Sequence, residues 1–156
     1  MEERTMVMWL IVSFLAALCL FALAAIWIRH MRERREMERH FVTAEELHAL
    51  LSSGREMLIF DLREPLDILT DSEIIPGAKI ISPQKVFLNP FLIPHEKDSV
   101  IYCTCPSEAT SRAVLKRALA MRFSRIKLLQ GGLEGWKAKG YPVEPYTKPL
   151  HLDAGE

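Results

Sequence analysis

Cysteine is scarce in this sequence, and neither sign of charge is in excess. The chain has three cysteines in 156 residues, Cys19, Cys103 and Cys105, which are too few for a disulfide framework. A single Cys-x-Cys pair without a second pair of ligands makes a poor zinc site, so we expect no metal and no cofactor. Twenty basic residues balance twenty acidic ones, whereas nucleic-acid-binding proteins usually carry a positive excess. We therefore expect no nucleic-acid partner.

The apolar residues are concentrated in one run near the start of the chain. Hydrophobic residues make up 49% of the sequence, which excludes a disordered protein. Between Met6 and Ile28, 23 consecutive residues carry no charge, and Ser13 is the only one outside the apolar set. A helix of this length spans about 35 Å, which exceeds the roughly 30 Å hydrocarbon core of a bilayer. Trp9 and Trp27 stand near its two ends, where indole rings favour the interface. The sequence predicts a transmembrane helix with the lipid bilayer as its partner.

A cleaved signal peptide is the alternative for this run. Signal peptides have an apolar part of about 7–15 residues after a basic start, whereas this chain begins Met-Glu-Glu-Arg-Thr before a longer run. A retained membrane anchor is therefore favoured.

The flanking charges predict the orientation, because lysine and arginine beside a membrane helix tend to stay in the cytoplasm. One arginine precedes the run, and five follow it: Arg29, Arg32, Arg34, Arg35 and Arg39. We expect a single-pass membrane protein with its N-terminus outside and the following domain in the cytoplasm.

The segment after the run mixes these arginines with glutamates. Glu33, Glu36 and Glu38 lie three or four residues from arginines and can pair with them on a continuing helix. Binding of the arginines to anionic lipid head groups is the alternative.

Within the apolar run 6–28, small residues offer a face for a homodimer or a protein partner in the membrane; they are Ala16, Ala17, Ala24 and Ala25.

The sequence divides into five parts: a short tail 1–5, the transmembrane helix 6–28, a charged juxtamembrane helix 29–40, a folded domain 41–148 and a flexible tail 149–156. In the domain, predicted strands at 57–62, 78–81, 99–105 and 126–129 alternate with helical patterns. Thr43 and Glu46 form a capping box at the first helix, and the proline-rich stretch 83–97 is expected to be irregular. This alternation predicts an α/β fold with an open, mostly parallel sheet flanked by helices.

Cys105 stands at a strand end, directly before a loop and a helix. Active sites of open parallel sheets collect beyond the carboxyl ends of strands. The start of a helix presents unpaired N–H groups that favour a thiolate or another anion. Cys105 is therefore a candidate nucleophile, although a free cysteine is more often a buried and inert residue. For Cys103, inside the predicted strand, the inert role is retained.

Four motifs, in order along the chain, resemble a rhodanese-like domain, the fold of single-domain sulfurtransferases. They read FDLREP, IPGA, VIYCTCPSEATSRA and LLQGGLEGWKAKGYPV, and they cover roughly Phe41 to Pro145. The resemblance places the catalytic cysteine at Cys105, because the family's Cys-x5-Ser spacing is met by Cys105 and Ser111. It assigns the persulfide- or substrate-binding loop to the residues that follow, namely Pro106, Ser107, Glu108, Ala109, Thr110, Ser111 and Arg112.

The resemblance also assigns supporting roles. Asp61 and Arg63 match an Asp-x-Arg that lies beneath the active loop, although an ordinary charged pair at a strand end explains them equally well. A Gly-Gly-x-x-x-Trp element matches Gly131, Gly132 and Trp136, to which we give packing and backbone roles. Cys103 shares a strand face with Cys105, so it is either a secondary thiol or a packed strand residue.

The activity implied by the resemblance is transfer of sulfane sulfur through a persulfide on Cys105 to a thiol or another thiophilic acceptor. Pro106 lacks an N–H, and Glu108 stands where thiosulfate-using relatives often have a basic residue. Since a carboxylate repels dianionic thiosulfate, a persulfide donor is favoured, with Arg112 as a partial compensation. Phosphatases with a similar loop carry an arginine at the position of Ser111, so a phosphatase activity is not favoured. The alternative function is a non-catalytic, membrane-tethered binding or regulatory module of the same fold.

Overall fold

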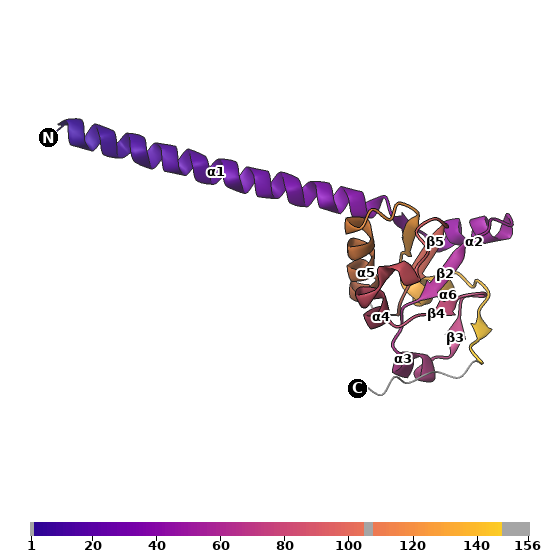
Figure 1. Ribbon diagram of the computed structural model, residues 1–156. Helices are drawn as coiled ribbons and strands as arrows, with labels where there is room; N and C mark the ends of the chain where they lie inside the picture. Colours follow the sequence, from indigo (N-terminus) through magenta and orange to yellow (C-terminus); the bar gives the residue numbers. More distant parts are fainter. Residues whose placement is uncertain (1, 105–107, 148–156) are drawn as a thin grey trace. The chain divides into compact units, whose positions relative to one another are not determined.

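The computed structural model describes residues 2–104 and 108–147 of the chain (Figure 1). It falls into two compact units, Met1–Arg39 and His40–Glu156. The tail expected at residues 149–156 lies outside the described residues.

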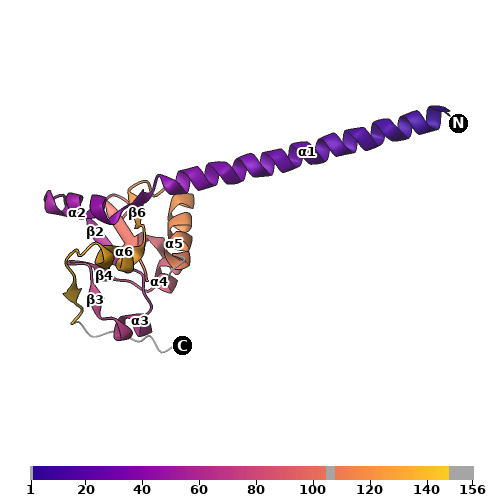
Figure 2. The same ribbon diagram turned by 180° about the vertical axis from the view of Figure 1, so that it is seen from behind.

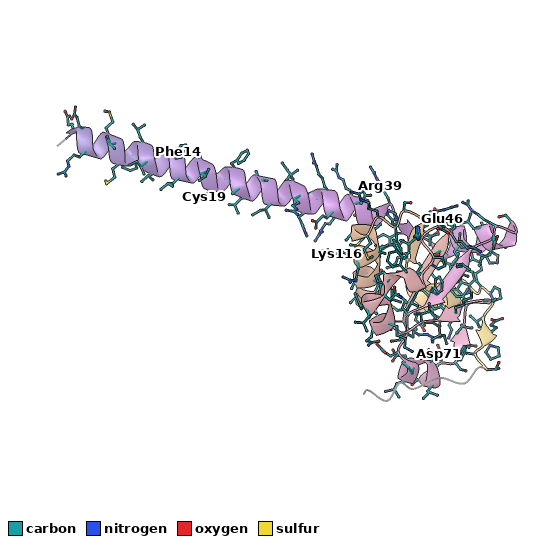
Figure 3. All side chains as sticks on the ribbon, viewed as in Figure 1. Phe14, Cys19, Arg39, Glu46, Asp71 and Lys116 are labelled. Carbon is teal, nitrogen blue, oxygen red and sulfur yellow. The ribbon has the colours of Figure 1, made fainter. Side chains whose placement is uncertain are left out.

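The first unit is one helix, α1 (Glu2–Glu38), of 37 residues. At about 1.5 Å per residue it is roughly 55 Å long, and it runs without a break from the apolar residues into the charged ones. It is long and apolar enough to cross a membrane, by length and composition. Phe14 and Cys19 project outward from it (Figure 3). Near its end, Arg29 pairs with Glu33 at 3.7 Å. An exposed pair of this kind adds less than about 1 kcal/mol to stability.

The second unit is built on a five-stranded sheet with the order β1-β6-β5-β2-β4. Every neighbouring pair in it is parallel. Its strands are β1 (Phe41–Val42), β2 (Leu58–Asp61), β4 (Lys79–Ile80), β5 (Ser99–Tyr102) and β6 (Ile126–Leu129). Two further strands, β3 (Glu73–Ile74) and β7 (Glu144–Pro145), form a small antiparallel pair beside it. The predicted open, mostly parallel α/β sheet is confirmed.

Helices cover both faces of this sheet. Figures 1 and 2 show α2 (Ala44–Ser52) and α6 (Gly132–Ala138) on one side and α4 (Pro83–Leu88) and α5 (Ala109–Ala120) on the other. Successive side chains along a strand point to opposite faces of the sheet, so each central strand contributes side chains to the packing against both helical layers. The core on the α2 and α6 side is made of Val42, Ala44, Leu47, Ile59, Ile75, Val100, Tyr102, Leu129, Leu133 and Trp136.

The start of α2 shows how local sequence sets an element boundary. The Thr43 Oγ1 accepts a hydrogen bond from the Glu46 N–H at 3.2 Å, and the Thr43 N–H donates to Glu46 Oε2 at 3.0 Å. These are the two reciprocal bonds of the capping box predicted from the sequence, and they satisfy N–H groups that have no partner inside the helix.

The proline-rich stretch is more regular than expected. Residues 83–97 contain α4 and a 3₁₀ helix, η1 (Pro90–Leu92), and an earlier helix, α3 (Pro65–Thr70), also starts on a proline. Each of these three helices has proline in its first turn. Proline is tolerated there because its missing N–H would have no partner inside the helix and its fixed φ suits helical geometry. The expectation of an irregular segment was therefore wrong in part, because a proline in the first turn is compatible with a short helix.

Candidate functional site

The site predicted from the sequence lies where β5 ends and α5 begins. The strand β5 is fully buried in the middle of the sheet. After it come Cys103 and Thr104, and the chain is described again from Glu108, which immediately precedes α5. The predicted nucleophile and the two loop residues after it, Cys105, Pro106 and Ser107, lie outside the described residues. The site is therefore described by the groups that flank Cys105 on both sides.

Ser111 is the most informative of the flanking residues. It lies in the first turn of α5 with a relative exposure of 1%. Among the described residues, its Oγ is the one buried side-chain polar atom without a hydrogen-bond partner. A buried hydroxyl without a partner costs about 1–3 kcal/mol, so such an atom is expected to gain a partner, such as a water, an ion or a bound group. Of its neighbours, Ala109 is exposed and Thr110 is half-buried.

Glu108 has a left-handed backbone, with φ 51° and ψ 22°. Its side chain is nevertheless almost buried, with 8% exposure. The Gly131 N–H donates to Glu108 Oε1 at 2.5 Å, and the Arg112 guanidinium donates to Glu108 Oε2 at 2.8 Å. The Arg112 guanidinium also lies over the Phe41 ring, 4.7 Å from its centroid. Arg112, expected from the sequence to compensate the Glu108 charge in part, is therefore paired directly with that carboxylate.

Asp61 and Arg63 form a buried ion pair at the carboxyl end of β2. Both side chains are fully buried, and their closest contact, Arg63 Nη2 to Asp61 Oδ2, is 2.7 Å. The Arg63 Nε also donates to both Asp61 oxygens, at 3.0 and 2.9 Å. The remaining donors reach backbone carbonyls, Nη1 to Asp71 at 2.8 Å and Nη2 to Glu73 at 2.8 Å. Although burial opposes its charge, the hydrogen bonds that Arg63 donates to Asp61 raise the pKa of Arg63 above its ordinary value. Every nitrogen of the guanidinium therefore has a partner, an arrangement typical of a structural ion pair.

Tyr102 is a buried residue of the site that the sequence did not single out. Its hydroxyl oxygen accepts the Ile75 N–H at 3.3 Å. Burial and the nearby Asp61 carboxylate raise the pKa of Tyr102 far above its ordinary value, so the phenol stays neutral. In the sequence, Tyr102 stands inside an apolar strand pattern, which predicts only a packing role. Its hydrogen bond and its proximity to Asp61 therefore could not be predicted.

The 131–133 turn, made of Gly131 and the first two residues of α6, Gly132 and Leu133, packs directly against the residue that follows β5. The Leu133 N–H donates to the Cys103 carbonyl oxygen at 3.2 Å. A Cβ on Gly132 would lie 2.0 Å from that same oxygen, so no side chain fits there. Cys103 itself is buried, with 4% exposure, which fits the packed strand residue among the two roles considered for it. Trp136 lies in the core and donates to the Pro142 carbonyl at 2.8 Å.

Metal binding has no visible basis at these residues. Over residues 2–104 and 108–147, no group of three or more histidine, cysteine, aspartate or glutamate side chains is placed to hold a metal ion.

Comparison with known proteins identifies the fold. A family model described as Rhodanese-like domain matches residues 43–139, more than half of the chain. The chain belongs to the rhodanese-like family. This rhodanese-like chain is 32% identical over 104 residues to the "Probable adenylyltransferase/sulfurtransferase MoeZ" of Mycobacterium tuberculosis. The match covers 65% of this chain and 25% of that protein, so the chain spans about a quarter of the length of its curated relative.

Solved structures agree on the rhodanese-like fold. The rhodanese-like domain of an Anabaena protein superposes with a TM-score of 0.55 at 23% identity, covering 75% of this chain and 89% of that one. A Rhodopseudomonas palustris protein described as "Possible Tyrosine Phosphatase" gives a TM-score of 0.56 at 23% identity, covering 72% and 93%. At these identities the two structures show a shared fold.

The contact of Gly132 with the Cys103 carbonyl gives a stability prediction. Gly132→Ala should destabilise the domain more than Gly140→Ala, because both glycines have a positive φ, 55° and 71°, but only Gly132 has a backbone oxygen in the way. The left-handed backbone costs alanine about 1–2 kcal/mol at either position, and overpacking adds about 1–3 kcal/mol at Gly132. Pulse proteolysis in urea, on the full chain in detergent, measures both variants. Equal stabilities would show that the contact is not close.

Proposed function

We propose that this chain is a membrane-anchored sulfurtransferase that carries sulfane sulfur on Cys105. The rhodanese-like domain and the similarity to a sulfurtransferase support a role in that family. The observation that carries the proposal is the buried Ser111 hydroxyl, which has no partner among the described residues and stands six residues after Cys105. A persulfide anion formed on Cys105 would supply the acceptor that this hydroxyl lacks.

The proposed reaction divides one sulfur transfer into two displacements. The Cys105 thiolate attacks the sulfane sulfur of a persulfide donor, a new S–S bond forms, and the donor leaves as its thiolate. An acceptor thiolate then attacks the outer sulfur of the Cys105 persulfide, and Cys105 is released as the thiolate that began the cycle. No external oxidant or reductant is needed, because the sulfane sulfur keeps its oxidation state. The Ser111 hydroxyl and loop N–H groups stabilise the anion between the steps.

The charges around the loop bear on the donor. Glu108 and Arg112 neutralise each other at 2.8 Å, and Pro106 removes one N–H from the loop. The described residues of the loop therefore provide no unpaired cation for a dianion such as thiosulfate. We accordingly favour a persulfide of a small thiol or of a protein as the donor.

The membrane is the second element of the proposal. The apolar part of α1 has the length and composition of a bilayer span, and its apolar side chains are exposed, with Phe21 at 76% and Leu20 at 68%. The excess of arginine after this part favours a cytoplasmic domain and an external N-terminus.

A non-catalytic, membrane-tethered module is the second candidate function, and one observation favours it. An apolar group on α4 and η1 is exposed to solvent, with Leu88 at 86% and Phe91 at 61%. Exposed apolar groups of this kind often mark a protein interface. This candidate needs no reaction at Cys105, so the two functions are separated by whether the cysteine takes up sulfur.

Sulfur uptake is therefore the first test of the proposal. Incubated with glutathione persulfide, the full chain should gain one sulfur atom, which Cys105→Ser abolishes and Cys103→Ser preserves. Intact-protein mass spectrometry measures the gain, and thiosulfate should load the protein less well. No gain with either donor would favour the binding module. A gain lost only in Cys103→Ser would move the nucleophile to Cys103.

Orientation has a separate test. Alkaline phosphatase, which is active only outside the cytoplasm, should be inactive when fused to the C-terminus, while a green fluorescent protein fusion at the same site should fluoresce. Deleting residues 6–28 should move the fluorescent fusion from the membrane to the soluble fraction. An active phosphatase fusion would reverse the proposed orientation.

A further inference from the structure

We propose that Glu108 is a positioning residue whose carboxylate fastens the segment carrying Cys105 to the 131–133 turn. Its effect on catalysis rests on the sulfurtransferase function proposed above, whereas the fastening itself can be measured without any reaction. Glu108 is three residues from Cys105 in the sequence, and its carboxylate is directed to Gly131 and Arg112.

The main observation is that one turn holds both described ends of this segment. At the first end, the Cys103 carbonyl accepts the Leu133 N–H at 3.2 Å. At the second end, the Glu108 carboxylate accepts the Gly131 N–H at 2.5 Å. The two donors are two residues apart in the 131–133 turn, and Gly132 between them is in close contact with the first end. Both described ends are therefore bound to the same short stretch of chain, the 131–133 turn.

The backbone of Glu108 supports a role for its side chain. A left-handed conformation costs a non-glycine residue about 1–2 kcal/mol, and such strain persists where the surroundings enforce it. Glycine would relieve the strain but has no group that could reach Gly131. Here the side chain makes a charge-assisted bond to an N–H in another element, and bonds of this kind are stronger than neutral ones.

Arg112 holds the other side of the carboxylate. Its guanidinium donates to Glu108 Oε2 at 2.8 Å and lies over the Phe41 ring in β1. The carboxylate therefore has a partner on each oxygen. Glu108 acts through geometry, and geometry matters here because a misplacement of about 1 Å in a reacting group can lower a rate by about 100-fold.

Three substitutions separate length, charge and acceptor. Glu108→Gln keeps the length of the side chain and an oxygen for the Gly131 N–H but loses the charge. Glu108→Asp keeps the charge but is one methylene too short, and Glu108→Ala removes both. The matched control is Glu134→Gln, because Glu134 is an exposed carboxylate on α6 that makes no side-chain hydrogen bond or ion pair with the described residues.

Steady-state sulfur transfer from glutathione persulfide to dithiothreitol, with the full chain in detergent, reads out the catalytic effect. Glu108→Ala and Glu108→Asp should lower kcat by about tenfold or more, with KM changed by less than about threefold, while Glu108→Gln restores most of kcat. The control should match the wild type. A fully active Glu108→Ala would overturn the proposal, because no side chain would then be needed at this position. A Glu108→Asp more active than Glu108→Gln would also overturn it, because the charge of the side chain would then matter more than its length.

Amide hydrogen exchange by mass spectrometry reads out the fastening independently of sulfur chemistry. The Gly131 N–H should exchange about tenfold faster in Glu108→Ala and Glu108→Asp than in the wild type, and at the wild-type rate in Glu134→Gln. Unchanged exchange in Glu108→Ala would overturn the proposal. If the wild type takes up no sulfur, the sulfurtransferase function is wrong, and exchange alone then decides whether Glu108 fastens the segment.

Discussion

The buried ion pair of Asp61 and Arg63 is the interaction on which the connection from β2 through α3 to β3 depends. Two charges without solvent are costly unless hydrogen bonds compensate them, and Arg63, besides its bonds to Asp61, also binds the Asp71 and Glu73 carbonyls. Asp71, labelled in Figure 3, also accepts from Lys137 of α6 at 2.6 Å. The hydrogen bond from Lys137 lowers the pKa of Asp71. One desolvated guanidinium thus joins β2, the end of α3, β3 and, through Lys137, α6.

The site after β5, at the same carboxyl edge of the sheet, is organised by backbone contacts more than by charged side chains. The end of β5 is held by the 131–133 turn, and the start of α5 is held by the same turn through Glu108. The charges that remain are paired, which leaves the Ser111 hydroxyl as the described buried group that still needs a partner. Such a site suits a small anion bound on the protein, such as a persulfide, better than a free dianion that must be attracted from solution.

Much of the fold could be predicted because it depends on local patterns. The capping box at Thr43 and the stop after α6 at Gly140 follow from contacts between residues close in sequence. The strand 126–129 could be predicted from its short apolar run. The helices that start on Pro65, Pro83 and Pro90 were missed, because each is too short to show a hydrophobic period and proline also occurs in turns. The two-residue strands have the same difficulty, because pairing with a distant strand, rather than propensity, makes them strands.

By itself, the sequence determined an apolar run of bilayer length, an alternating α/β pattern and the motif order that indicates Cys105. Each of these is written in residue types and short spacings. Only the tertiary structure decided that Glu108 is paired with Arg112 and bound to Gly131. The same holds for the burial of Ser111 without a described partner and for the two backbone carbonyls that Arg63 binds. The physical reason is that a charge acts according to what surrounds it, and those surroundings come from residues far apart in the chain.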